Sequence, residues 1–240
     1  MEPHPLTPPG KYPTVIDNVQ EVALFGTADL AFWLEYLKPE GLWPYNDNGH
    51  AEVLISATDL KWMGKRFNEF TFSLSVCRNP DDGERHGLYL VHAYNSSSLL
   101  AFMERAFFQT PYYPARIQMQ AKLPASAALG ERDNLTLSMK MSGQGSCLSR
   151  REDVWEGPLY LPRYMTKMRG PGNFFFARLS GYIETYPFSP LDSFELKPSR
   201  DDRVLQSLVE SHFTGQEWRI RANATHAKSK TYPRNGVLPG

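Results

Sequence analysis

The clearest pattern in the chain is the alternation of apolar and polar residues over 115–123 and 135–141. In the first segment Ile117, Met119 and Ala121 fall on one face, and the residues between them are polar. Such alternation is typical of a β-strand with one polar face, which either meets water or lines a polar cavity. The pattern alone leaves both alternatives open.

Other segments also have the composition of strands, and only three short segments favour helices. The predicted strands cover residues 15–25, 51–57, 67–76, 87–94, 173–185 and 194–197. The predicted helices cover 28–37, capped by Thr27, then 99–108, capped by a serine run, and a segment that ends at Ser211, capped by Ser199, Asp201 or Asp202. These elements predict a β-rich α+β fold.

The two ends differ in composition from the middle of the chain. Residues 1–14 contain five prolines and are expected to form an irregular arm. Residues 222–240 are polar, with lysine, proline and glycine, and are expected to form a loosely held tail. Between them, 15–221 shows no repeat and no linker, so we expect one domain.

Composition restricts the functions that we consider. Lys+Arg and Asp+Glu both number 26 in a chain of 240 residues, which argues against nucleic acid as the main partner. No apolar run approaches the roughly 20 residues of a membrane span, and the first residues do not resemble a secretory signal. With two widely spaced cysteines and six scattered histidines, we expect a cytoplasmic protein without a disulfide, metal or other cofactor.

Several motifs occur in the order seen in a known superfamily. The segment ERAFFQTPYY at 104–113 resembles the R-E-x-x-x-Y-P-K-K segment of the acetoacetate decarboxylases, and RFNEFTFSLSV at 66–76 resembles the strand that carries their active-site glutamate. PEGL at 39–42 and YMTK at 164–167 resemble two further motifs. The resemblance extends over residues 15 to 197 and implies an antiparallel β-barrel or cone with helices packed outside.

A closer resemblance is to one uncharacterised branch of that superfamily. The segment FFQTPYYPAR at 107–116 is similar to its F-F-x-L-P-Y-Y-x-A-R signature. FNEF at 67–70 and GLYL at 87–90 resemble its two preceding strand motifs. This branch implies no settled activity.

The chain departs from the decarboxylases at their nucleophile. Those enzymes form a Schiff base through a lysine whose pKa is depressed by an apolar pocket and a neighbouring cation. Here Tyr112 and Tyr113 occupy the Lys-Lys positions, and Gln20 aligns with an arginine that the resemblance implies. Schiff-base decarboxylation by this route is therefore not expected. Lys122 or Lys140 is an alternative amine, although solvated surface lysines are the more common case.

Glu69 is the retained acidic group. Between Phe67, Phe70 and Phe72, burial is expected to raise its pKa and suit it to acid–base work. The alternative is a structural ion pair with Arg105 or Arg116.

The remaining candidates surround that glutamate in the predicted site. Tyr112 and Tyr113 are expected to donate hydrogen bonds to a carbonyl or enolate, or else to pack at the end of the helix. Arg116 is a candidate carboxylate clamp, and His92 is a candidate proton carrier with a structural alternative. Arg163 is also expected to border the cavity, and only the superfamily pattern suggests this position.

Together these residues predict a small-molecule enzyme that acts on a carbonyl or carboxylate compound by acid–base chemistry. Enolisation, cyclisation, dehydration and hydrolysis all fit. The alternatives are a non-catalytic protein that binds a small ligand and a structural protein whose interior is filled by its own side chains. The resemblance also implies homo-oligomers.

Overall fold

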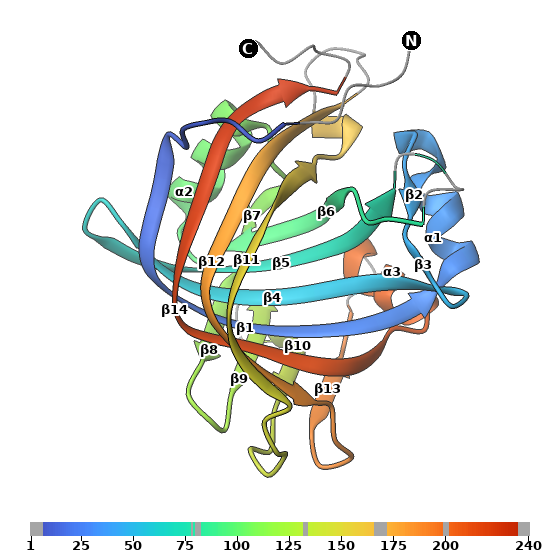
Figure 1. Ribbon diagram of the computed structural model, residues 1–240, viewed down its shortest axis with the longest axis vertical. Helices are drawn as coiled ribbons and strands as arrows, with labels where there is room; N and C mark the ends of the chain where they lie inside the picture. Colours follow the sequence, from blue (N-terminus) through green and yellow to red (C-terminus); the bar gives the residue numbers. More distant parts are fainter. Residues whose placement is uncertain are drawn as a thin grey trace.

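A computed structural model describes residues 7–77, 79, 83–131, 134–165, 172–198 and 202–234. Long strands dominate it, as expected for a β-rich fold (Figure 1). The strands of the large sheet are β1 (Thr14–Asp29), β2 (Trp43–Pro44), β4 (His50–Trp62), β5 (Lys65–Cys77), β6 (Gly87–Asn95), β7 (Tyr112–Pro114), β11 (Ser149–Tyr160), β12 (Asn173–Pro187) and β14 (Thr214–Pro233), with β3 (Asn46–Asp47) paired to β4.

The large sheet curls round on itself. Its strand order is β2-β5-β4-β1-β14-β12-β11-β6-β7, and β6 also pairs with β5. The contact between β6 and β11 is parallel and only two residue pairs long, Leu88–Leu159 and Tyr89–Tyr160. Nearly all the other pairs are antiparallel, as the sequence resemblance implied.

A small sheet and several short helices pack against the large sheet. The small sheet has the order β13-β10-β9-β8, formed by β8 (Arg116–Gln120), β9 (Ser126–Glu131), β10 (Asn134–Lys140) and β13 (Ser193–Leu196). The helical segments are α1 (Leu30–Leu37), η1 (Lys38–Glu40), α2 (Ser98–Met103), η2 (Glu104–Phe108), η3 (Arg163–Met165) and α3 (Arg203–Glu210). Figure 1 shows α1 and α2 on opposite sides of the curled sheet.

Alternation along the strands separates the core from the interior of the curl. On β5, Phe70, Phe72 and Leu74 are buried in the main core, whereas Glu69 and Thr71 line a cavity. The same core contains Trp33 of α1, Leu205 of α3 and Met139 of β10, among others. Because successive side chains on a strand point to opposite faces, the apolar set packs outward and the polar set points inward.

A glycine permits one of the bends. Gly181 of β12 has a φ of 144°, and a Cβ added there would lie 2.7 Å from the carbonyl oxygen of Asn223 on β14. The register between these two strands also shifts after Gly181. Such an irregularity bends a strand and increases its twist, and only glycine tolerates both the φ and the close approach.

The predicted C-terminal tail is wrong over residues 222–233, which form the second half of β14. This strand pairs with β1 on one side and with β12 on the other. Its composition is polar because its inner face, which includes His226 and Lys228, lines the cavity. Residues 1–6 of the predicted arm, 235–240 of the tail and 166–167 of the YMTK motif lie outside the described residues.

The start of α1, the form of the second helix and the strands β9 and β11 also differ from expectation. Strand β1 continues to Asp29, whose side chain accepts a hydrogen bond from Phe32 N at 2.7 Å and caps α1 in place of Thr27. Asp202 caps α3, while Ser199 and Asp201 lie outside the described residues. The predicted second helix divides into α2 and a π-helical segment. Strand β11 was not predicted, because four charged residues, 150–153, begin it.

Candidate functional site

A cavity of about 900 Å³ occupies the interior of the curled sheet. Its wall is built by inward-pointing residues of β1, β4, β5, β11, β12 and β14, and α2 and η2 contribute Leu100, Met103, Glu104 and Phe108. A volume of this size is typical of small-ligand sites. The interior is therefore not filled by the protein's own side chains, contrary to the structural alternative.

Glu69 and Tyr112 meet in this cavity through a direct hydrogen bond. The Tyr112 hydroxyl donates to Oε2 of Glu69 at 2.9 Å, and Nδ2 of Asn95 donates to Oε1 at 3.0 Å. Strand pairing creates this arrangement, since Glu69 on β5 lies opposite Asn95 on β6, and Tyr112 on β7 lies beside Ala93 on β6. All three side chains line the cavity.

The surroundings of Glu69 make it a weaker acid than an ordinary glutamate. Burial, followed by the neighbouring Glu104 carboxylate, raises the pKa of Glu69 to about 7, against the opposing effects of Tyr112, Lys228 and Asn95. Among the described residues Glu69 has no ion pair, so the structural pairing with Arg105 or Arg116 is not observed. Arg105 instead donates to the Tyr112 carbonyl oxygen. Burial and Glu69 also raise the pKa of Tyr112, which keeps the phenol protonated.

Lys228 of β14 is the cavity lysine that sequence reasoning missed. Its Nζ lies 2.6 Å from Oε2 of Glu104, and it faces the rings of Phe108 and Phe175 at 4.4 and 4.6 Å from their centroids. Thr110 also donates to Oε2 of Glu104, at 2.6 Å. Lys228 could have been identified if residues 222–233 had been predicted as a strand. The alternation along that strand points Lys228 to the same inner face as His226.

The lysines proposed from sequence lie elsewhere. Lys122 is exposed in the connection between β8 and β9, and Lys140 is exposed at the end of β10. Neither lines the cavity. The polar face of β8 is exposed to solvent, whereas Thr136 and Ser138 of β10 are buried; neither strand's polar face lines the cavity.

Tyr113 and His92 are held together away from Glu69. Their rings stack at a centroid distance of 4.8 Å with an interplanar angle of 9°, and neither residue lines the cavity. Burial lowers the pKa of His92 to about 4. The two adjacent tyrosines thus point to opposite faces, as expected for an extended segment, and Tyr112 is the inward one.

The other predicted binding residues are also not brought to the cavity. Arg116 is exposed on β8. The Arg163 backbone N–H bonds to the Glu40 carboxylate at 3.1 Å, and its Nη1 bonds to the Pro39 carbonyl oxygen at 2.5 Å. Gln20 is half-buried but does not line the cavity, whereas its neighbour Glu21 does. None of these three residues lines the cavity.

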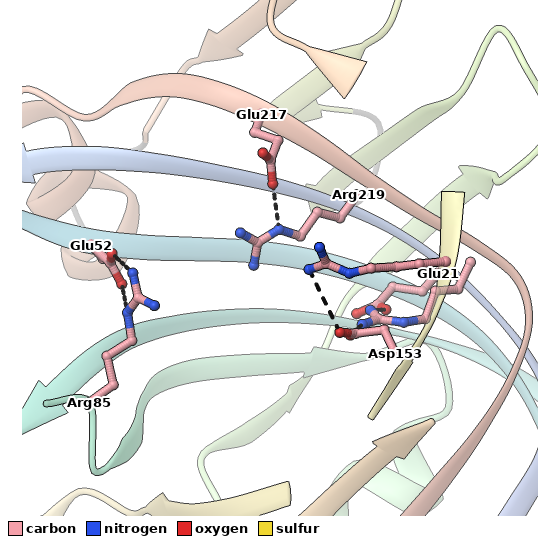
Figure 2. Close-up of polar contacts among 8 residues, drawn as sticks. Glu21, Glu52, Arg85, Asp153, Glu217 and Arg219 are labelled. Carbon is pink, nitrogen blue, oxygen red and sulfur yellow. Dashed lines mark hydrogen bonds and ion pairs between the residues drawn. The ribbon is translucent and has the colours of Figure 1, made fainter. Parts of the chain in front are cut away.

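A second group of cavity residues consists of arginines and acids. Arg221 of β14 is buried and bonds to Glu21 at 2.5 Å and to Asp153 at 2.7 Å. Ser56 also donates to Glu21, at 2.8 Å. Burial acts to raise the pKa of Glu21, but Arg221 beside it holds that pKa below its usual range. Figure 2 shows Glu21 and Asp153 in this group, with the pairs Glu52–Arg85 and Glu217–Arg219 nearby.

The described part of the chain shows neither a metal site nor a membrane-spanning helix. No group of three histidine, cysteine or acidic side chains is arranged to hold a metal ion there. No helix in that part is long and apolar enough to cross a membrane.

Comparison with solved structures agrees with this architecture. An acetoacetate decarboxylase-like enzyme from Sphingomonas wittichii RW1 superposes with a TM-score of 0.59 and 12% identity, over 96% of this chain and 98% of its own. Acetoacetate decarboxylase from Legionella pneumophila gives 0.63 and 12%, over 96% and 92%. The enduracididine biosynthesis enzyme MppR, complexed with pyruvate, gives 0.61 and 13%, over 93% and 89%.

The similarity to known proteins is found in the fold and not in comparisons of the sequence. No family model and no curated protein matches the chain. At identities of 12–13% the similarity concerns the backbone architecture. The chain has the acetoacetate decarboxylase-like fold.

Proposed function

We propose that the protein is a small-molecule enzyme that moves a proton on a carbonyl or carboxylate compound bound in the cavity, without a Schiff base. The observation that carries this proposal is Glu69, whose pKa is raised to about 7 while its carboxylate is held by Tyr112 and Asn95 beside a cavity of about 900 Å³. A general base works best when its pKa lies near the working pH. Structures with this fold include an MppR complex with pyruvate, an oxo-acid.

In the proposed reaction the ionised Glu69 takes a proton from the carbon next to the substrate carbonyl. Tyr112 keeps its own proton because its pKa is raised. Once Glu69 is protonated, it attracts the phenol hydrogen less strongly. Tyr112 can then turn its hydrogen bond to the oxyanion that develops on the substrate.

Lys228 supports the same step from the β14 side. Its ammonium carries three N–H donors, and Glu104 receives one of them. A second N–H directed to the substrate oxygen would stabilise the enolate. An ammonium held in an ion pair with Glu104 is not the nucleophilic form of a lysine.

Proton exchange tests this proposal without knowledge of the natural product. A panel of oxo-acids in D2O, followed by proton NMR, should lose signal at the carbon next to the carbonyl faster than in buffer. Glu69→Gln should abolish the acceleration, and Tyr112→Phe should reduce it by about 10- to 100-fold. Tyr113→Phe is the matched control, because Tyr113 lies on the other face of the sheet, and it should leave the rate unchanged.

The alternative is a protein that binds a small ligand without reaction. It is favoured by the cavity wall, where Arg85, Arg221 and Lys228 are each paired with an acid. Native mass spectrometry of the purified protein would support it by revealing a ligand that the protein returns unchanged. Accelerated exchange that depends on Glu69 would contradict it.

A further inference from the structure

Cross-strand rows of inward residues connect the two polar groups of the cavity. One row runs from Glu69 on β5 through Thr58 on β4 and Glu21 on β1 to Arg221 on β14. The adjacent row runs through Thr71, Ser56, Ala23 and Arg219. All eight residues line the cavity.

The second row ends on an arginine with unused donors. Arg219 donates from Nε to Glu217 at 2.7 Å, and among the described residues its two outer nitrogens have no hydrogen-bond partner. Figure 2 shows the single dashed line that joins Glu217 to Arg219 and none to its outer nitrogens. The guanidinium also lies over the ring of Phe25, 4.4 Å from the centroid. The ring and Glu217 hold the guanidinium in place and leave its outer edge available.

The other two arginines of this group, Arg221 and Arg85, each give at least one outer nitrogen to an acid. Arg221 gives one outer nitrogen to Glu21 and the other to Asp153. Arg85 gives Nε and Nη2 to the two oxygens of Glu52. Arg219 is therefore the one of these three arginines with both outer nitrogens unpaired among the described residues.

The residues between Glu69 and Arg219 are small. Thr71, Ser56 and Ala23 make up the rest of the second row beside Arg219, so this part of the cavity wall carries only short side chains. Three strand spacings separate Thr71 from Arg219, about 14 Å along the sheet. Both end side chains reach inward and shorten that gap. A ligand that reaches from Glu69 to Arg219 must therefore be longer than a three-carbon acid.

We propose that Arg219 binds the distal carboxylate of an elongated oxo-acid whose carbonyl lies at Glu69 and Tyr112. This assignment rests on the proposed function for the identity of the carbonyl end. The planar outer edge of a guanidinium matches a carboxylate through two parallel hydrogen bonds. Glu217 neutralises part of the charge, which suits a singly charged carboxylate better than a doubly charged phosphate.

Calorimetric titration with matched probes tests the assignment. The probes are 6-oxoheptanoate, which has a carbonyl and a distant carboxylate, and 2-heptanone, which lacks the carboxylate. The unsubstituted protein should bind 6-oxoheptanoate at least about tenfold more tightly than 2-heptanone. Arg219→Gln should erase that preference. Arg150→Gln, which removes an exposed arginine outside the cavity, should retain it.

The outcomes separate this proposal from the proposed function. A preference that is absent in the unsubstituted protein, or that survives in Arg219→Gln, overturns the role of Arg219. If Arg219→Gln does not fold by circular dichroism, Arg219→Lys decides, and its preference must fall severalfold. Binding is measured without turnover, so a preference seen without proton exchange overturns only the enzyme function. Exchange seen without the preference overturns only the role of Arg219.

Discussion

The Tyr112 hydroxyl donates a 2.9 Å hydrogen bond to the Glu69 carboxylate, although the two residues are 43 positions apart in the chain. The contact exists because β6 lies between their strands, paired with β5 on one side and with β7 on the other. The bond stabilises the ionised carboxylate, while burial and Glu104 favour the neutral acid. The pKa of Glu69 is thus a balance of contacts that can be removed one at a time.

Removal of the phenol should raise the pKa of Glu69 further. Tyr112→Phe deletes the hydrogen bond that stabilises the charged form, so the pKa should move above about 7. Carbon-13 NMR of labelled glutamate, with the signal assigned through Glu69→Gln, would measure the shift. Tyr113→Phe should leave this pKa unchanged, and a fall in Tyr112→Phe would contradict the assigned geometry.

Removal of the Glu104 charge should have the opposite effect. Glu104→Gln deletes the repulsion that raises the pKa of Glu69 and leaves the Lys228 cation uncompensated. Both changes favour the carboxylate, so its pKa should fall toward the usual range. The same NMR titration checks it, with Glu152→Gln as the control at an exposed site. An unchanged pKa would show that burial alone sets it.

Glu69 should also make stability depend on pH. Its pKa is raised to about 7 in the folded state from a usual 4.5, so the folded protein binds more protons between these values. Its contribution is fully present below about pH 4.5 and is lost as the pH rises through about 7, by up to about 3 kcal/mol. Urea denaturation at pH 5 and pH 8 would measure the loss.

Glu69→Gln provides the reference for that measurement. Other groups, such as His92 with its lowered pKa, titrate in both proteins, and their effects cancel in the comparison. The unsubstituted protein should lose more stability than Glu69→Gln between pH 5 and pH 8. Equal losses would mean that Glu69 titrates normally in the folded protein.

Proton exchange should follow the ionised form of Glu69. The rate should rise with pH through about 7 and then level off, because the carboxylate is the proposed base. Glu104→Gln should move the midpoint to lower pH, in parallel with the NMR result. A rate that falls as the pH rises would instead indicate that protonated Glu69 acts as an acid.

The second half of β14 should be essential for folding. A chain that ends at residue 221 loses the partner of β1 and β12 over residues 222–233 and removes Lys228 from the cavity. We expect such a chain to lose cooperative thermal unfolding, whereas a chain that ends at residue 234 should retain it. Circular dichroism would compare the two, and a cooperative transition in the shorter chain would contradict this role.

The polar composition of β11 and β14 explains why they were not predicted from sequence. A strand is recognised from apolar residues on at least one face. In β14 the inner residues Glu217, Arg219, Arg221 and Lys228 face a polar cavity, and the outer residues alternate irregularly because of register shifts against β1 and β12. Local sequence therefore resembled a solvated tail.

The sequence by itself determined the strand-rich composition, the inward carboxylate of Glu69, and the presence at positions 112 and 113 of tyrosines, which cannot form an imine. These features depend on local alternation and on residue type, which are visible in the chain itself. Tertiary structure alone decided that Tyr112 points to Glu69 while Tyr113 stacks on His92. It also decided that Lys228 and Arg219, rather than Lys122 and Arg116, face the cavity. Those outcomes depend on strand order and register, which bring together residues that are distant in the sequence.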